Sequence, residues 1–211
     1  MLDQWFALRL RLVSRGLMPQ PTDSLSLRLP AEGAMLWGTV GDAQPQRVPL
    51  SDPGAAILEP SCHGSVHRTV YGCRDDVCAV LWGGGPFGRQ LQAFGGQMPA
   101  VFDEQIRQLG RMGAATREVA ALPRSLAQGG NVVLHDGQVL TLGMTATRLA
   151  LNAELFEKCA KAYVPAVATG ARVHALPWLV RYVANERLMK EEARARIQVR
   201  SGAVPQETRG Y

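Results

Sequence analysis

Apolar residues recur along the chain at the two spacings that distinguish helices from strands. Near the N-terminus, Trp5, Leu8 and Leu12 fall on one face of a helix. Leu25 and Leu27 then alternate with serines, which is typical of a strand that buries one face. The same spacings predict helices over residues 5–17, 65–74, 87–94, 103–112, 145–163 and 176–200. They predict strands over residues 24–29, 35–37, 77–82, 117–122, 132–134 and 139–142.

Turn residues join these elements in a definite order. Pro30 and Gly33 mark the turn of a first hairpin, and Asp136-Gly137 closes a second hairpin through a turn that favours positive φ. Residues 41–60 are rich in Pro, Asp and Gln and are expected to form a loop with one short strand. Helices and hairpins in this order predict an α/β domain with a mostly antiparallel sheet.

Length and composition are those of an ordinary globular protein. The 211 residues fit a single domain over residues 1–211, with a polar C-terminal tail over residues 201–211, because one core usually divides only above roughly 250 residues. Apolar residues make up 46% of the chain and charged residues 19%, which is enough apolar surface for a sizeable core.

The net charge of +5 does not indicate a nucleic-acid partner. The most basic segment, residues 181–200, is interleaved with Glu186, Glu191 and Glu192 at helical i,i+4 spacing. This pattern favours a solvated helix face over a polyanion site, while dispersed arginines suit small anions.

A cytoplasmic location is expected from three negative features. The longest apolar runs, such as Val77 to Trp82, are far shorter than the ~20 residues of a membrane span. Asp3 and Arg9 disagree with the residue order of a secretory signal. The four cysteines lack C-x-x-C spacing, so we expect reduced thiols. Because no apolar segment is long enough to cross a bilayer, we expect no membrane partner.

The segment from His67 to Trp82 reads His-Arg-Thr-Val-Tyr-Gly-Cys-Arg-Asp-Asp-Val-Cys-Ala-Val-Leu-Trp. It resembles the part of class II aldolases, sugar-phosphate epimerases and adducin head domains in which a His-x-x-x-Tyr helix leads through Arg-Pro-Asp to a buried strand. Ser24 to Pro30 is similar to the family's Gly-Asn-x-Ser-x-Arg hairpin, and Asn131 to Gly143 to its strand pair with the third zinc histidine. The resemblance covers most of the chain and implies a three-layer α/β/α fold, assembled as a homotetramer with active sites between subunits.

The resemblance also implies that the zinc site is degenerate. In the family the buried strand ends in His-x-His, the first two zinc ligands, but Trp82 and Gly84 stand at those positions here. The third ligand position falls on His135 or Asp136, and the alternative is that these residues belong to an ordinary edge strand and hairpin turn. Catalytic zinc generally needs three protein ligands, so we expect no metal and no cofactor.

Histidines are the remaining candidates for proton transfer. The family's catalytic glutamate falls on His63, which can move protons near neutral pH. With His67, His135 and Asp136 it is a candidate catalytic residue of a rewired site. The alternative is a polar loop with a solvated His63 and a packed His67.

Hydroxyls and backbone amides are the candidates for binding an anion. By the resemblance, Ser24 replaces a phosphate-binding asparagine, Thr39 stands for a turn hydroxyl, and Ser61 lies beside Cys62. Gly83 and Gly84, before a helix that carries Arg89, could offer N–H groups to an anion, although such a loop is more often only a turn.

Two function classes follow from these residues. One is a metal-independent lyase, epimerase or decarboxylase-like enzyme, or a binder, acting on a small anionic or hydroxylated molecule. The other is a non-catalytic scaffold or assembly protein that keeps the aldolase-like tetramer. Whether the histidines line one concave pocket discriminates between them.

Overall fold

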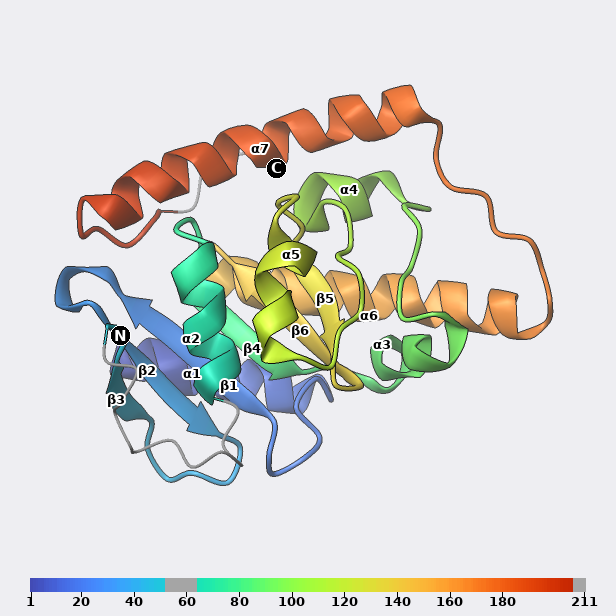
Figure 1. The fold of residues 1–211 in the computed structure, drawn as a ribbon. Coiled ribbons are helices and arrows are strands. Elements are labelled where there is room, and N and C mark those ends of the chain that lie inside the picture. Colours follow the sequence, from blue (N-terminus) through green and yellow to red (C-terminus); the bar gives the residue numbers. More distant parts are fainter. Residues whose placement is uncertain (52–63, 207–211) are drawn as a thin grey trace.

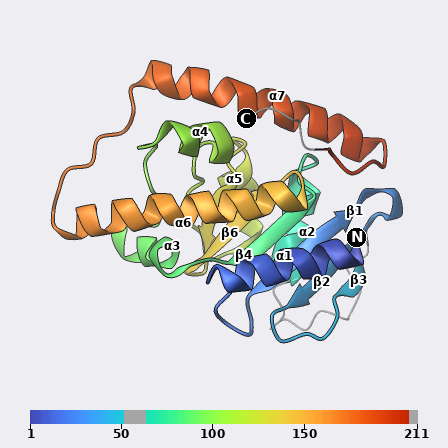
Figure 2. The same ribbon diagram turned by 180° about the vertical axis from the view of Figure 1, so that it is seen from behind.

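The structure is a computed structural model, and it describes residues 1–51 and 64–206. A sheet lies between two layers of helices (Figures 1 and 2). Its strands are β1 (Ser24–Leu29), β2 (Ala34–Thr39), β3 (Gln46–Pro49), β4 (Ala79–Gly83), β5 (Val132–His135) and β6 (Gln138–Gly143). The α-helices are α1 (Leu2–Ser14), α2 (Gly64–Cys73), α3 (Pro86–Gln90), α4 (Asp103–Leu109), α5 (Leu122–Leu126), α6 (Ala146–Ala168) and α7 (Trp178–Arg200).

The strand order is β3-β2-β1-β4-β6-β5, and each neighbouring pair is antiparallel. The predicted α/β fold with a mostly antiparallel sheet flanked by helices is therefore confirmed. α1 and α6 cover one face, and α2 with α5 covers the other (Figures 1 and 2).

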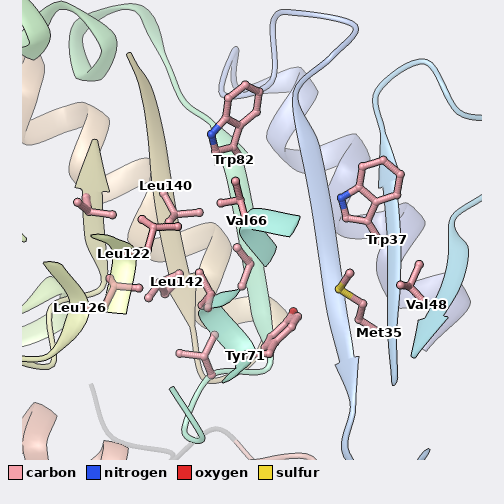
Figure 3. Close-up of a cluster of buried hydrophobic side chains, with 14 residues drawn as sticks. Met35, Trp37, Val48, Val66, Tyr71, Trp82, Leu122, Leu126, Leu140 and Leu142 are labelled. Carbon is pink, nitrogen blue, oxygen red and sulfur yellow. The ribbon is translucent and has the colours of Figure 1, made fainter. Parts of the chain in front are cut away.

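Side-chain alternation along the strands builds a different core on each face. Leu27 and Leu81 point toward α1 and α6, where they pack with Trp5 and Leu149. Between the sheet and α2 lies a second cluster, which extends from Trp82 at one end to Tyr71 at the other (Figure 3).

Local chemistry explains the elements that the sequence predicted. Asp136 (φ 50°) and Gly137 (φ 75°) adopt the positive φ values expected of the β5–β6 turn. Thr145 caps α6 by accepting a hydrogen bond from the Arg148 backbone N–H at 3.0 Å. β3 is the short strand expected within the loop after residue 41.

One predicted strand is wrong. Residues 117–122 contain a single 3-10 turn, Val119–Ala121, which leads directly into α5. Pro123 sits in the first turn of α5, where its missing N–H is harmless, whereas a strand would lose a ladder hydrogen bond there. Leu122 and Leu126 are one helical turn apart and bury themselves in the α2 face.

α7 crosses the end of the molecule beside α4 (Figures 1 and 2). Its second half is anchored through Leu188, Glu192, Ala195 and Val199, which are all buried. Within the described residues, no helix is both long enough and apolar enough to span a membrane.

Candidate functional site

The candidate residues lie in a row across the α2 face of the sheet. Ser24, at the start of β1, pairs in register with Thr39 on one side and with Trp82 on the other. Trp82 in turn pairs with Leu140, next to β5. Thr39, Ser24 and Trp82 share the face of the buried residues that contact α2, because side chains alternate between the two faces.

His135 completes this row through a hydrogen bond to Trp82. The indole Nε1–H of Trp82 donates to Nδ1 of His135 at 3.2 Å, although the two residues are 53 positions apart in the chain. Since an indole nitrogen is only a donor, Nδ1 must accept and the neutral ring carries its proton on Nε2. Both side chains are buried. The row therefore ends in an imidazole of defined tautomer.

His67 reaches the same row from the first turns of α2. Its Nε2 lies 2.8 Å from Ser24 Oγ, and its Nδ1 lies 2.8 Å from Ser26 Oγ. Ser26 Oγ also lies 2.9 Å from the hydroxyl of Tyr71, one helical turn further along α2. Hydroxyls both donate and accept, so either tautomer of His67 can be satisfied. This network binds α2 to β1.

Tyr71 is uncharged in this network. Burial raises the pKa of Tyr71 well above its ordinary value, against the opposing effect of the Ser26 hydrogen bond. The phenol therefore stays protonated at physiological pH and works as a hydrogen-bonding group rather than as a base.

Two further candidates lie at the margins. The hydroxyl of Thr39 donates to Asp42 Oδ2 at 3.0 Å, and the same oxygen accepts the Thr39 backbone N–H at 2.7 Å. Asp136 is exposed in the β5–β6 turn, whereas His135 is buried beside Trp82. His135 and Asp136 are the two candidates for the third zinc-ligand position that the resemblance implies, and of the two only His135 lies in the row.

Solved structures of known proteins share this arrangement of elements. An L-fuculose 1-phosphate aldolase aligns with a TM-score of 0.74 and 18% identity, over 89% of this chain and 95% of its own. YgbL of Klebsiella pneumoniae, a putative aldolase/epimerase/decarboxylase, aligns with a TM-score of 0.71 and 19% identity, over 86% and 96%. An aldolase II superfamily protein of Pseudomonas syringae aligns with a TM-score of 0.65 and 16% identity, over 94% and 89%.

The chain has a class II aldolase-like fold. No protein-family model and no curated protein sequence matches it. At such low identity the class II aldolase-like fold is what the structures share, and the chemistry has to be argued from the site.

Neither residue at the two positions where the resemblance implies zinc ligands can coordinate a metal ion. Trp82 offers an N–H donor and no lone pair for a metal. Gly84 has φ of 100°, and a Cβ added there would lie 2.5 Å from the Cβ of Val139, so the position admits no side chain. Within residues 1–51 and 64–206, no group of three His, Cys, Asp or Glu side chains could hold a metal ion.

The backbone N–H groups that follow the glycine loop after β4 already donate to a carboxylate of the protein itself. The carboxylate of Glu157 on α6 accepts the backbone N–H groups of Phe87 and Gly88 at 2.8 and 2.9 Å. Arg89 pairs with the buried Asp23 at 2.7 Å and donates to the carbonyl of Gly84. An external anion at this loop would have to displace two carboxylates, so anion binding by Gly83, Gly84 and Arg89 stays a prediction.

Ser61, Cys62 and His63 lie outside the described residues, and their roles also stay predictions. Conversely, Ser26 and Tyr71 belong to the network but were not among the predicted site residues. Two spacings could have identified them. Ser24 and Ser26 are two apart in a strand, and His67 and Tyr71 are four apart in a helix, so each pair shares a face.

Proposed function

We propose that the chain binds a small hydroxylated or anionic molecule without zinc at the row Thr39, Ser24, Trp82 and His135. We further propose that it acts on this molecule as a metal-independent enzyme of the lyase, epimerase or decarboxylase type. The observation that carries the proposal is the Trp82–His135 hydrogen bond at positions where the resemblance implies metal ligands. At these positions the imidazole of His135, held by its hydrogen bond from the indole of Trp82, is the group that we propose contacts the ligand in place of a zinc ion.

The row suits an oxygen-rich ligand because of its hydrogen-bonding capacity. Nε2–H of His135 is a donor, the hydroxyl of Ser24 can donate or accept, and the hydroxyl of Thr39, which donates to Asp42, can accept. Donors aimed at a developing oxyanion are the usual means of stabilising enolate-like charge in the absence of a metal ion. His135 and His63 are the proposed groups for proton movement, since imidazole titrates near neutral pH.

The first experiment measures binding of L-fuculose 1-phosphate by calorimetry in the presence of a chelator, with zinc determined by elemental analysis. The ligand is taken from the name of a structural neighbour. We expect binding without zinc, and weakening by about tenfold in His135→Ala and in Ser24→Ala, as for loss of one charge-assisted hydrogen bond. His174→Ala is the matched control, because His174 is exposed outside the row.

Two results would contradict the proposal. One is a stoichiometric zinc ion whose removal abolishes binding, because the row would then be a metal site. The other is equal binding by the wild type, His135→Ala and Ser24→Ala, because the ligand would then lie elsewhere.

The second candidate function is a non-catalytic scaffold assembled as a tetramer. It is favoured by the first half of α7, where Leu179 and Val183 are 56% and 61% exposed on one side of the helix. Apolar side chains exposed together often mark an interface. Light scattering of the full chain tests this proposal, and a monomer across micromolar concentrations would contradict it. Leu179→Ser with Val183→Ser should lower the mass of an oligomer that uses this surface.

A further inference from the structure

A cavity of about 630 Å³ lies between the start of α7 and the segment around α4. Its walls are built from fixed parts of the fold. The backbone N–H of Leu176 donates to the carbonyl of Ala100 at 2.8 Å, which ties the approach to α7 onto the segment before α4. Gln105 accepts from the N–H of Val101 and donates to the carbonyl of Pro99, both at 3.1 Å. The volume is that of a typical small-molecule site.

The cavity interrupts a packed face of α7. The side chains at positions 178, 181, 182 and 185 follow helical spacing and line the cavity. Leu188 and Glu192 continue the same stripe into the second half of the helix, where they are buried against the body of the protein. The first turns of this face thus border a cavity, whereas its later turns pack against the body of the protein.

The lining combines an apolar floor with a cationic rim. Met98, Ile106 and Met112 are buried on the floor, and Arg111 and Arg181 stand at the rim. No acidic side chain lines the cavity within the described part of the chain. Among the described residues, neither Arg111 nor Arg181 forms an ion pair. The guanidinium of Arg111 donates a hydrogen bond to the side-chain amide oxygen of Gln128 at 3.1 Å. Methionines adapt to varied apolar shapes.

We propose that this cavity binds an amphipathic carboxylate, with its apolar body on the methionine floor and its charged group at Arg111 and Arg181. Trp178 and Tyr182, which are 70% and 69% exposed, cover the apolar body from the side of α7. This ligand differs from the one proposed for the row, and the cavity shares no lining residue with the row. The two proposals can therefore fail independently.

The test uses octanoate as the probe, with 1-octanol as its uncharged counterpart, in calorimetric titrations of the full chain. We expect octanoate to bind at one site per chain and more tightly than octanol. The double variant Arg111→Ala with Arg181→Ala should weaken octanoate binding by about tenfold or more, as for lost charge-assisted hydrogen bonds, and leave octanol unchanged. Arg172→Ala is the matched control on the exposed segment before α7.

A second variant tests the cavity itself. Ala175 is exposed and lines the cavity, so Ala175→Trp fills the space without disturbing the core and should abolish binding of both probes. Ala168→Trp, on an exposed position at the end of α6, should have no effect. The proposal is overturned if octanoate does not bind, if it binds no better than octanol, or if neither variant changes its affinity. An oligomer that excludes octanoate also overturns it, because a second copy of the chain would then occupy the cavity.

Discussion

The two ends of β4 and β5 hold buried polar groups of opposite character. Before the strands begin, Arg74, Asp76 and Asn131 form a charged cluster with Glu192 of α7. Where the strands end, the Trp82–His135 pair and the hydrogen-bonded network of His67 lie on the α2 face. The same two strands therefore run from a buried ionic cluster, the charged end, to these hydrogen-bonding side chains, the hydrogen-bonding end. The Arg89–Asp23 ion pair lies beside the loop that follows β4.

The charged end fixes the packing of several elements through Arg74. Arg74 donates to both carboxylate oxygens of Asp76 at 2.9 and 2.7 Å, to the carbonyl of Gly130 at 2.8 Å and to Glu192 at 3.2 Å. Burial lowers the pKa of Arg74, but the hydrogen bond and charge of Asp76 raise it above its ordinary value. A guanidinium has only donors and cannot change role, so this geometry holds α2, β4, β5 and α7 together.

The hydrogen-bonding end can change its hydrogen bonds around His67. The hydroxyl protons of Ser24 and Ser26 rotate and the imidazole of His67 exchanges tautomers, so these atoms can act as donors or as acceptors. The charged end is therefore expected to maintain the fold, and the proposed chemistry belongs to the hydrogen-bonding end.

The largest effect that would test this division is expected from Arg74→Ala. It leaves Asp76 and Glu192 buried without their cation, and removal of one partner from a buried pair costs about 3–5 kcal/mol. Urea denaturation measures the loss. Arg200→Ala is the control, because its pair with Asp75 is 67% and 37% exposed and should contribute only about 0–1 kcal/mol. Equal losses in the two variants would contradict a special role for the charged end.

A smaller effect is expected from pH at the same end. Burial raises the pKa of Glu192 to about 7, which outweighs the attraction of Arg74. In the unfolded chain the pKa of this glutamate is near its ordinary value of about 4.3. As pH rises, the unfolded chain therefore releases the proton at a lower pH than the folded state does. This contribution is fully present at low pH and is lost as pH rises through about 7.

Glu192→Gln should remove this pH dependence. Between pH 4 and pH 8 the wild type should lose about 3–4 kcal/mol relative to the variant, because the two pKa values, about 7 and about 4.3, differ by about 2.7 units at 1.36 kcal/mol each. The difference between the two unfolding curves is the measurement, because Glu154 has a lowered pKa, through its hydrogen bond to Arg11, and changes stability in the opposite direction. If the stability difference between wild type and variant stays constant from pH 4 to pH 8, the pKa of Glu192 is not raised in the folded state.

The smallest effect is expected at the hydrogen-bonding end. Trp82→Phe removes the N–H that fixes His135, which should cost about 1 kcal/mol beyond the loss of ring volume. Trp37→Phe is the matched control, since Trp37 is buried on the same face and its Nε1 has no hydrogen-bond partner among the described residues (Figure 3). The ¹⁵N chemical shifts of His135 should change from a single tautomer to a mixture in Trp82→Phe only. Unchanged shifts would mean that Trp82 does not set the tautomer.

Much of the fold could be predicted from local sequence because the causes are local. The alternation of Leu25 and Leu27 predicts β1, although Ser24 and Ser26 on its other face are buried as well. Asp136-Gly137 supplies the turn, and Thr145 supplies the cap of α6. Residues 117–122 were predicted wrongly, because the apolar run before Pro123 did not distinguish a short strand from a short helix.

The candidate site could be predicted only in part. From sequence, the resemblance puts Trp82 and Gly84 at two zinc-ligand positions and His135 or Asp136 at the third, and the loss of the zinc site stays a prediction. Sequence spacing could not show that Trp82 donates to His135, since this contact depends on how β4, β6 and β5 are placed side by side. It also could not show that Val139 closes the space at Gly84, or that Glu157 occupies the N–H groups after the glycine loop. Hydrogen bonds and steric contacts act over a few ångströms in space, so tertiary structure alone decided which distant residues share them.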